Sequence, residues 1–504
     1  MSRKATTTAE NTNDVAGDPN YPWRHPIPSG WKTSRLGDVM DIVRGISFPK
    51  EAKSLEPRVG HVACLRTANV QRDVEWGDLW FVPEQHVKRE DQYVCPGDIL
   101  ISTANSYDLV GKVAPVRTMP HRATLGAFIS LLRPREELDA KFAYYQISWS
   151  DTQDRIRSTA STTTNISNVS TKKLSNIELA FPPREQQQRI VAEIEKQFSR
   201  LDEAVANLKR VKANLKRYKA AVLKAAVEGK LTEEWRKAHP DVEPASKLLD
   251  RILAERRAKW EEAEQAKIGA KGKAPKNDKW KAKYKEPTEP DTTNLPELPE
   301  GWMWASLDQL SEVVRGGSPR PAGDPRYFGG PVPWITVGPL TADESDYLHS
   351  VPDGLTLEGK ERSRYIEPET LLLTNSGATL GVPKITLIGG CINDGVAALL
   401  GVEHPLKRYL VTFLRTKTSS MRRINQGAAQ PNLNTSIIKA TVVPLPPEAE
   451  QHRIMAEVDR RLSLLRETEA QVDATLKRAE RLRQSVLQRA FTNPSVGNAS
   501  KVTQ

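Results

Sequence analysis

The feature that most constrains this chain is an internal repeat. Pro28–Trp31 recurs as Pro299–Trp302, a shift of 271 residues, and the stretch Phe181–Leu201 recurs as Leu445–Leu465 with a shift of 264. Identical residues stand at matched positions along the second pair, and its register holds as far as Val222 and Val486. Coincidence does not keep one register over that distance, so the chain consists of two copies of one unit.

Each copy begins with a region that predicts a compact, mainly β domain with some helix. Short apolar and β-branched runs are interrupted by Gly and Pro, as in Val94–Ile101 and in Thr370–Thr374. Such runs bounded by turn residues are typical of strands. Each region ends at a Pro-Pro pair, which suits the start of a helix. The expected domains are residues 28–183 and 298–447.

After each Pro-Pro pair the pattern changes to a long helix, over 184–230 and 448–491. Three- and four-residue steps between apolar positions predict a coiled-coil seam. The expected seam residues are Ile190, Ile194, Phe198, Leu201, Val205, Leu208, Val211, Leu215, Tyr218 and Val222 in the first helix, and Ile454, Val458, Leu462, Leu465, Val472, Ala479, Leu482 and Val486 in the second.

Each helix must bury its apolar stripe, and the helix of equal length in the other copy is the nearest partner. Antiparallel pairing would place the two β-rich domains at opposite ends of a rod of roughly 68 Å. The alternative is that each helix packs separately on its own domain. The fold class that we expect is α+β: two β-rich domains joined by two long antiparallel coiled-coil helices.

The remaining segments are an insertion and two tails. Residues 231–297 separate the copies; their first part, Glu243–Ala266, has helical spacing, and Lys267–Pro296 has the composition of a linker. Residues 1–27 and 492–504 are expected to be tails.

Composition favours an intracellular protein with an anionic partner. The net charge is +11, which suggests nucleic acid or a membrane surface, although solubility also explains a modest excess. Three cysteines without ligand-like spacing favour a reducing compartment. No apolar run is long enough to span a membrane, and Met1–Asn20 lacks an apolar signal core. We therefore expect a cytoplasmic protein that does not associate with membranes.

Known catalytic motifs are missing from the sequence. It contains no P-loop, no Gly-x-Ser-x-Gly elbow and no His-Glu-x-x-His helix, and neither Pro-Pro pair follows the Asn or Asp that an amino-methyltransferase would carry. Asp353, Glu358 and Lys360 resemble a nuclease centre, but they lie close together in the sequence and only the second copy has them. We expect a chain without a catalytic centre or a metal site.

The order of these features resembles the DNA-specificity (S) subunit of type I restriction–modification enzymes. The resemblance rests on Pro182–Val191 and Pro446–Met455, where Glu-Gln and Arg-Ile follow the Pro-Pro pair of the first copy. The second copy departs slightly, with His452 in place of Gln188 and Met455 in place of Val191. The helix ends Ala221–Leu231 and Ser485–Phe491 and the Gly-Trp starts of both domains also look like that family.

This resemblance implies a non-catalytic subunit that binds double-stranded DNA. Each β-rich domain would be a target-recognition domain that reads one half of a bipartite sequence, and the helices would set the spacing and dock two methyltransferase (M) subunits. Motor–nuclease (R) subunits would complete an assembly that methylates adenine or cuts unmethylated DNA. S-adenosylmethionine, ATP and Mg²⁺ would be bound by those partners, so this chain would need no cofactor.

Polar residues in loops after matched strands are the expected DNA contacts, because Arg, Asn and Gln read base edges and Lys binds phosphate. Turn-rich stretches before each domain closes are further choices. The candidates are Arg44, Asn105, Lys112, Thr164 and Asn165 in the first domain, and Arg315, Asn375, Lys384, Gln426 and Asn432 in the second. For each of them the alternative is a solvated loop residue or a turn former.

Two other functions remain open at this stage: a coiled-coil scaffold whose β-rich domains bind proteins, and a nuclease built on Asp353 and Glu358. The net charge does not distinguish between these functions and DNA binding. Residues 184–230 carry twelve Lys and Arg against six Asp and Glu, whereas residues 300–439 carry fourteen of each sign. The basic surplus thus lies on the first helix, where it would serve non-specific steering or partner docking.

Overall fold

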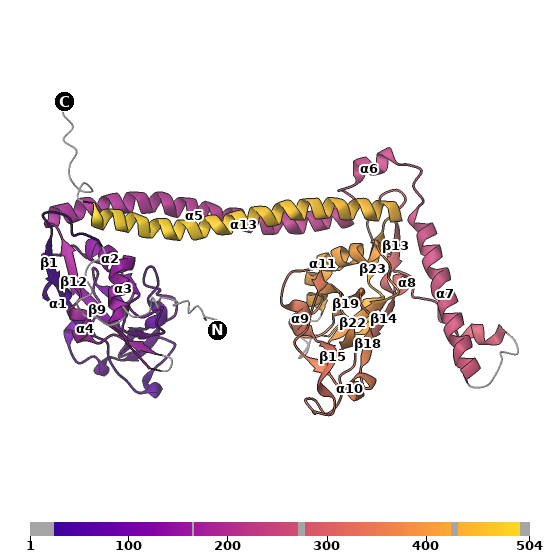
Figure 1. The fold of residues 1–504 in the computed structure, drawn as a ribbon, viewed down its shortest axis with the longest axis horizontal. Coiled ribbons are helices and arrows are strands. Elements are labelled where there is room, and N and C mark those ends of the chain that lie inside the picture. Colours follow the sequence, from indigo (N-terminus) through magenta and orange to yellow (C-terminus); the bar gives the residue numbers. More distant parts are fainter. Residues whose placement is uncertain (1–24, 164–165, 271–277, 425–431, 494–504) are drawn as a thin grey trace, which may run out of the picture. The chain divides into compact units, whose positions relative to one another are not determined.

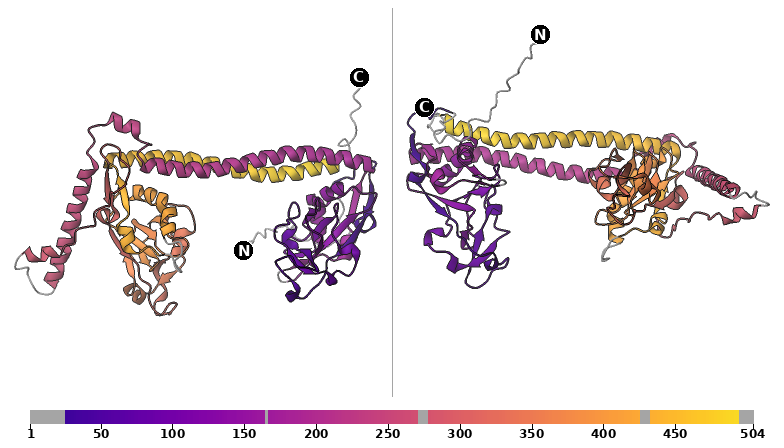
Figure 2. Two further views of the ribbon diagram at one scale, coloured as in Figure 1. Left: turned by 180° about the vertical axis from the view of Figure 1, so that it is seen from behind. Right: turned by 60° about the horizontal axis from the view of Figure 1, so that its bottom comes forward.

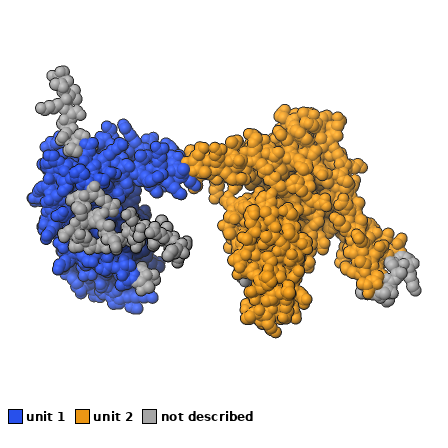
Figure 3. Space-filling view, viewed as in Figure 1, with its two compact units in different colours: residues 1–209, 473–504 blue, residues 210–472 orange. Residues whose placement is uncertain are grey.

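The computed structural model describes residues 25–163, 166–270, 278–424 and 432–493, which divide between two units (Figure 3). The first unit comprises residues 1–209 and 473–504, and the second comprises residues 210–472. Each unit therefore contains one β-rich domain together with parts of both long helices.

The first unit is built from short strands in four small sheets. Its strands are β1 (Lys32–Arg35), β2 (Met40–Arg44), β3 (His61–Leu65), β4 (Trp80–Pro83), β5 (Ile99–Ser102), β6 (Ala104–Asn105), β7 (Val113–Pro115), β8 (Ala123–Leu125), β9 (Ile129–Pro134), β10 (Ser161–Thr162), β11 (Ser167–Asn168) and β12 (Glu178–Phe181). The sheet orders are β1-β12, β2-β9-β5-β7, β4-β3-β8 and β10-β11-β6. Its α-helices are α1 (Leu36–Val39), α2 (Ala140–Ser148), α3 (Ser150–Ser158) and α4 (Thr171–Ser175), followed by the long α5 (Arg184–Val227).

The second unit repeats this plan with longer sheets. Its strands are β13 (Met303–Ser306), β14 (Glu312–Arg315), β15 (Phe328–Ile335), β16 (Tyr347–Leu348), β17 (Gly354–Leu355), β18 (Arg364–Ile366), β19 (Thr370–Thr374), β20 (Pro383–Thr386), β21 (Gly390–Ile392), β22 (Val396–Leu400) and β23 (Val442–Leu445). They form sheets β13-β23, β14-β22-β19-β20-β16 and β17-β15-β21-β18. The helices of this domain are α8 (Leu307–Leu310), α9 (Val337–Thr341), α10 (Leu357–Glu361), α11 (Leu406–Ile424) and α12 (Thr435–Lys439), followed by the long α13 (Glu448–Thr492).

The main sheets of the two units correspond. In both, the first and last strands of the domain pair antiparallel, and a second sheet contains a parallel pair (β3 with β8, β15 with β21). The central ladder β2-β9-β5-β7 matches β14-β22-β19-β20. The repeat found in the sequence is therefore a repeat of topology as well.

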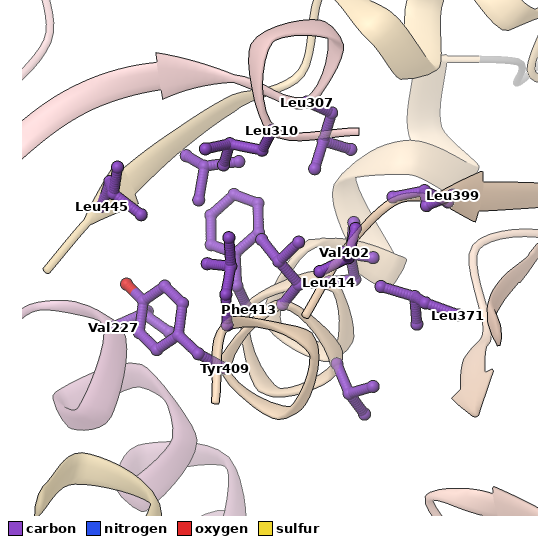
Figure 4. Close-up of a cluster of buried hydrophobic side chains, with 14 of the residues drawn as sticks. Val227, Leu307, Leu310, Leu371, Leu399, Val402, Tyr409, Phe413, Leu414 and Leu445 are labelled. Carbon is purple, nitrogen blue, oxygen red and sulfur yellow. The ribbon is translucent and has the colours of Figure 1, made fainter. Parts of the chain in front are cut away.

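The core of the second unit joins its helices to its strands. Figure 4 shows Tyr409 and Phe413 of α11 packed among Leu307 and Leu310 of α8 and Leu445 of β23. All five side chains are fully or almost fully buried. The amphipathic pattern of α11 thus attaches this helix to the strand pair β13-β23, from which α13 departs.

The two long helices lie side by side in each unit (Figures 1 and 2). In the first unit, Ile194 near the start of α5 shares a core with Phe491 at the end of α13, and the Arg483 guanidinium lies 4.7 Å from the centre of the Phe198 ring. In the second unit, Val227 at the end of α5 shares a core with Ile454 near the start of α13. The start of one helix meets the end of the other, so the helices are antiparallel and the α+β fold class is confirmed.

The alternative, in which each helix packs only on its own domain, is wrong because each of these cores contains the start of one long helix and the end of the other. Phe491 of α13, for example, contacts Phe142 of α2 with ring centres 5.5 Å apart. Three expected seam residues are corrected: Val211, Tyr218 and Leu482 are 40%, 48% and 45% exposed. Their positions drift off the buried stripe because an α-helix repeats every 3.6 residues rather than every 3.5.

The insertion is more ordered than its composition predicts. It contains α6 (Glu233–Ala238), α7 (Ala245–Ala270) and a 3₁₀-helix at Asp278–Lys283. Trp280, in the stretch expected to be a linker, is buried and stacks on Trp260 of α7 with ring centres 6.0 Å apart. Aromatic stacking, which composition does not reveal, folds this segment back on α7.

Within the described ranges, every helix is too short or too polar to cross a bilayer.

Candidate nucleic-acid interface

The central sheet of the first unit brings three of the expected DNA contacts to one end. Arg44 ends strand β2 and pairs with the second residue of β9, and Ser102 ends strand β5 and pairs with the first residue of β9. Asn105 follows on β6, and Lys112 precedes β7, the neighbour of β5. We call this end of the sheet, with the loops 103–112 and 126–128 and the residues 161–163 and 166–168, the first loop edge.

The polar side chains at the first loop edge are held in different ways. Arg44 is exposed. The Asn105 amide donates to Ser102 Oγ at 3.3 Å, and its Oδ1 accepts from the backbone N–H of Ser106 at 2.9 Å. The Lys112 ammonium donates to Gln71 Oε1 at 2.6 Å. The Arg44 side chain thus lies at the surface with no hydrogen-bond partner among the described residues, whereas Asn105 is oriented by its neighbours.

The hairpin β10-β11 adds to this edge because β11 pairs with β6, with Ser167 opposite Asn105. A hydrogen bond of 2.9 Å also joins the Thr162 and Ser167 hydroxyls across the hairpin. Two expected contacts, Thr164 and Asn165, lie outside the described residues.

The second unit has a matching end of its central sheet. Arg315 and Thr374 end β14 and β19, and both pair with the first two residues of β22. Asn375 follows Thr374 directly, and exposed Asn432 forms a bridge with Ser376. We call this end, with the loops 316–320, 375–381, 393–395 and 432–434, the second loop edge. The expected contact Gln426 lies outside the described residues.

The expectation of surface loop residues is wrong for Asn375 and Lys384, which are 0% and 1% exposed. Lys384 is not in a loop: it lies within β20, where it pairs with Leu372 and turns inward, and its ammonium binds Asp343 Oδ1 at 2.5 Å. That hydrogen bond lowers the pKa of Asp343. Strand pairing turns the Lys384 side chain into the domain, and the Asn375 side chain is buried in the loop that follows β19.

Two arginines that the sequence did not single out lie beside Arg315. The Arg364 guanidinium donates to the Arg315 carbonyl at 2.9 Å, and Arg315 in turn donates to the Asp394 carbonyl at 2.7 Å. Arg320, 73% exposed, lies 3.9 Å from the Asp394 carboxylate, whose pKa is lowered first by the Ser318 hydroxyl. These arginines converge from three segments, so only strand pairing reveals the cluster.

The long helices carry exposed apolar side chains besides their seam. Val211, Tyr218, Leu464 and Leu482 are between 40% and 55% exposed. The other expected seam residues are buried or half-buried, with Ile190 and Ile454 fully covered. A helix pair with apolar side chains on an outer face has surface left to contact a further protein.

The structure does not support a nuclease centre in the loop that contains Asp353 and Glu358. Asp353 and Glu358 are both exposed, and the Lys360 ammonium lies 4.1 Å from the centre of the Tyr365 ring instead of between two carboxylates. No group of three or more His, Cys, Asp and Glu side chains in the described part of the chain is arranged to hold a metal ion.

Comparison with known proteins identifies the family. The model of the type I restriction modification DNA specificity domain matches twice, at residues 28–217 and 299–478. The specificity subunit of the type I restriction enzyme EcoKI from Escherichia coli is 30% identical over 46% of this chain and 50% of its own length. That of StySPI from Salmonella potsdam is 29% identical over 43% and 46%. The chain thus spans about half the length of these curated relatives.

A solved structure supports the fold. One chain from a study of complex assembly and conformational transition of the type I R-M system superposes with a TM-score of 0.57, at 18% identity, over 93% of this chain and all of its own length.

The structure defines a class first: a duplicated β-rich domain on a pair of antiparallel helices, with a different surface on each copy. The two matches of the family model cover most of the chain and fall on the two copies, so the chain belongs to the type I restriction–modification DNA-specificity family. It is a specificity subunit of the type I restriction–modification class.

Proposed function

We propose that this chain reads a bipartite DNA sequence, with each β-rich domain recognising one half-site. The target-recognition domains would be residues 28–183 and 298–447. The observation that carries the proposal is the pair of loop edges: the loops beside equivalent strand ends present different side chains in the two units. Two such surfaces on one framework suit two unlike half-sites, because side chains on base edges determine specificity.

The helices would set the distance between the half-sites. Helix α5 has 44 residues, which at 1.5 Å per residue gives about 66 Å. One to two turns of duplex DNA, at about 34–36 Å per turn, fit this scale. We also propose that the exposed apolar side chains of α5 and α13 dock two methyltransferase subunits, with motor–nuclease subunits joining the assembly. S-adenosylmethionine, ATP and Mg²⁺ would bind those partners, and the complex would act in the cytoplasm.

Methylation mapping tests this function. The full chain would be expressed with the methyltransferase subunit of its own system in a host without other adenine methylation, and the host genome sequenced by a method that detects N6-methyladenine. We expect modified adenines in one split motif whose half-site centres lie one to two helical turns apart. Recovery of a stable complex without any split methylated motif would contradict the proposal.

Docking is tested separately on the helices. Aspartate at Leu464 and Leu482 should sharply reduce co-purification of the methyltransferase subunit, because it puts charge on an apolar contact. The matched control is Leu55→Asp, at a residue of the first domain that is 73% exposed. Equal recovery of the complex for both variants would remove the docking role of these side chains.

A further inference from the structure

Four large apolar side chains cluster at the first loop edge and are exposed. Tyr107, Leu109, Phe128 and Ile166 are 50%, 44%, 65% and 52% exposed. They come from three separate segments, the loop after β6, the turn before β9 and the hairpin β10-β11. We call them the apolar edge patch.

Backbone pairing brings the three segments together. The N–H groups of Thr103 and Ala104 donate to the Phe128 carbonyl at 2.9 and 3.2 Å. The next residue, Asn105, pairs with Ser167, which follows Ile166. The position of these side chains is therefore set by ordered strands, and their exposure leaves apolar surface that a partner would cover.

The surroundings of the patch match a DNA groove. Asn105 lies within the patch, and Lys112 follows Leu109 at its border. Lys173 Nζ donates to Ser161 Oγ on β10 at 3.0 Å, which puts a second cation beside the hairpin. One acidic residue, exposed Asp108, is in the same loop. Cations for phosphates, an amide for base edges and apolar groups together complement A·T base pairs, whose major-groove edge carries the thymine methyl group.

Among the residues that the structure describes, the second loop edge has no equivalent patch. There the hydrogen bond from the Asn375 N–H goes to the Gly395 carbonyl, so Gly395 takes the place of Phe128. The bond from Gly381 to Thr374 repeats the bond from Gly111 to Ser102, and in this register Gly377 and Thr379 take the places of Tyr107 and Leu109. Arginines are exposed at that edge instead. Any role of the apolar edge patch is therefore confined to one half-site.

We propose that Tyr107 and Phe128 contact thymine methyl groups in the half-site that the first domain reads, and so make that half-site selective for A·T pairs. This inference rests on the proposed function. It adds the base class and the residues that select it.

The test uses the full chain purified with the methyltransferase subunits of its own system. Duplexes that carry the selected motif are drawn from a randomised library, and binding is measured on these duplexes and on copies in which deoxyuridine replaces thymidine in one half-site. Each methyl removed from the half-site of the first domain should weaken binding about fourfold where it is contacted. Phe128→Ala should weaken binding about tenfold.

The Phe128→Ala complex should also lose part of its sensitivity to the deoxyuridine replacement, since the methyl group that Phe128 contacts has lost its partner while Tyr107 keeps its own. Leu55→Ala and Val59→Ala, at side chains of the same domain that are 73% and 103% exposed, are the matched controls and should bind like the parent. The preference at the other half-site should not change in any of these variants.

The outcomes separate the two proposals. If the parent complex selects no bipartite motif, the proposed function fails and this inference fails with it. If the parent selects such a motif but ignores the missing methyl groups, or if Phe128→Ala stays as sensitive to them as Leu55→Ala, only the inference about the apolar edge patch is overturned.

Discussion

The two loop edges lie on equivalent strands but differ in the side chains that they expose: one is largely apolar and the other is rich in arginine. The first presents Tyr107 and Phe128 with lysines nearby, and the second presents Arg315, Arg320 and Arg364. The ladders beneath them pair in the same way. The framework is thus kept while the surface changes, because side chains at strand ends are free of the packing that constrains the core.

The frameworks themselves differ in where they use charge. Where the domain meets the helices, the second unit buries Glu450, which accepts from Thr232 Oγ1 at 2.6 Å, from the Arg236 guanidinium at 2.9 Å and from Trp302 Nε1 at 2.8 Å. The matched residue of the first unit is Gln186, and the Trp31 indole N–H, equivalent to that of Trp302, has no partner among the described residues.

The largest effect is expected from Glu450→Ala. It leaves the half-buried Arg236 guanidinium and the Trp302 N–H without their acceptor, so the second unit should lose about 3–5 kcal/mol of unfolding free energy. Hydrogen exchange, followed separately for peptides of each unit, measures this loss. Gln186→Ala is the control and should cost less than about 1 kcal/mol. Equal losses would show that the carboxylate does not distinguish the units.

At Asp98 the first unit, and not the second, should depend on a buried carboxylate for its stability. Its carboxylate is 1% exposed, and the Arg133 guanidinium donates to it twice, at 2.7 and 2.8 Å. Asp98→Ala should destabilise the first unit by about 3 kcal/mol, because a half-buried guanidinium loses its partner. Thr370, at the matched position, is the control: its alanine variant should cost about 1 kcal/mol. The same exchange measurement checks both, and a smaller loss for Asp98→Ala would contradict this account.

Acid should destabilise α13 in the second unit more than it destabilises α5 in the first unit. Hydrogen bonds from Arg460 and Arg461 lower the pKa of Glu457 to about 2. A carboxylate with a lowered pKa stabilises the fold above its unfolded pKa of about 4.3, and this stability is lost as the pH falls toward 2. Glu457→Gln should cost about 1 kcal/mol at pH 7 and flatten the pH dependence between 4.5 and 2.

The control for this pH effect is Glu193→Gln, since Glu193 is the matched residue of α5. Its carboxylate is 44% exposed and 3.9 Å from the Lys196 ammonium. Urea unfolding at a series of pH values should show little change for this variant. An equal flattening in both variants would attribute the pH dependence to other carboxylates.

The smallest effect is expected at Asn375, whose amide nitrogen and oxygen are buried without a hydrogen-bond partner among the described residues. The first unit has Thr103 at this position. Asn375→Thr should leave stability unchanged or raise it by up to about 1 kcal/mol, because an unpaired buried amide is removed. A clear loss on urea unfolding would indicate that the amide has a stabilising role.

Much of the fold could be predicted from the sequence because periodic patterns are local. The expected first helix begins at Arg184 and the second at Glu448, as α5 and α13 do. The repeat even reveals a turn that local rules miss. Gly97 after Pro96 has a φ of +93°, and Glu369 after Pro368 adopts +62° at the matched position. A glutamate would not by itself predict left-handed backbone.

The candidate interface was predicted only in part. Arg44, Asn105 and Arg315 do reach the loop edges, whereas Lys384 is buried against Asp343. No local sequence pattern predicts that Phe128, Arg320 and Arg364 lie at the loop edges. Whether a side chain at a strand end faces solvent depends on strands paired from distant segments, and a single sequence does not contain that register.

A duplicated unit with two long amphipathic helices can be recognised from the amino-acid order alone, since both signals are periodic and do not depend on tertiary contacts. Which side chains are presented at the two loop edges follows from tertiary packing. Three segments must pair before Tyr107, Phe128 and Ile166 become one surface. The physical reason is that helix periodicity is encoded in neighbouring residues, whereas a recognition surface is assembled by strand pairing over long distances.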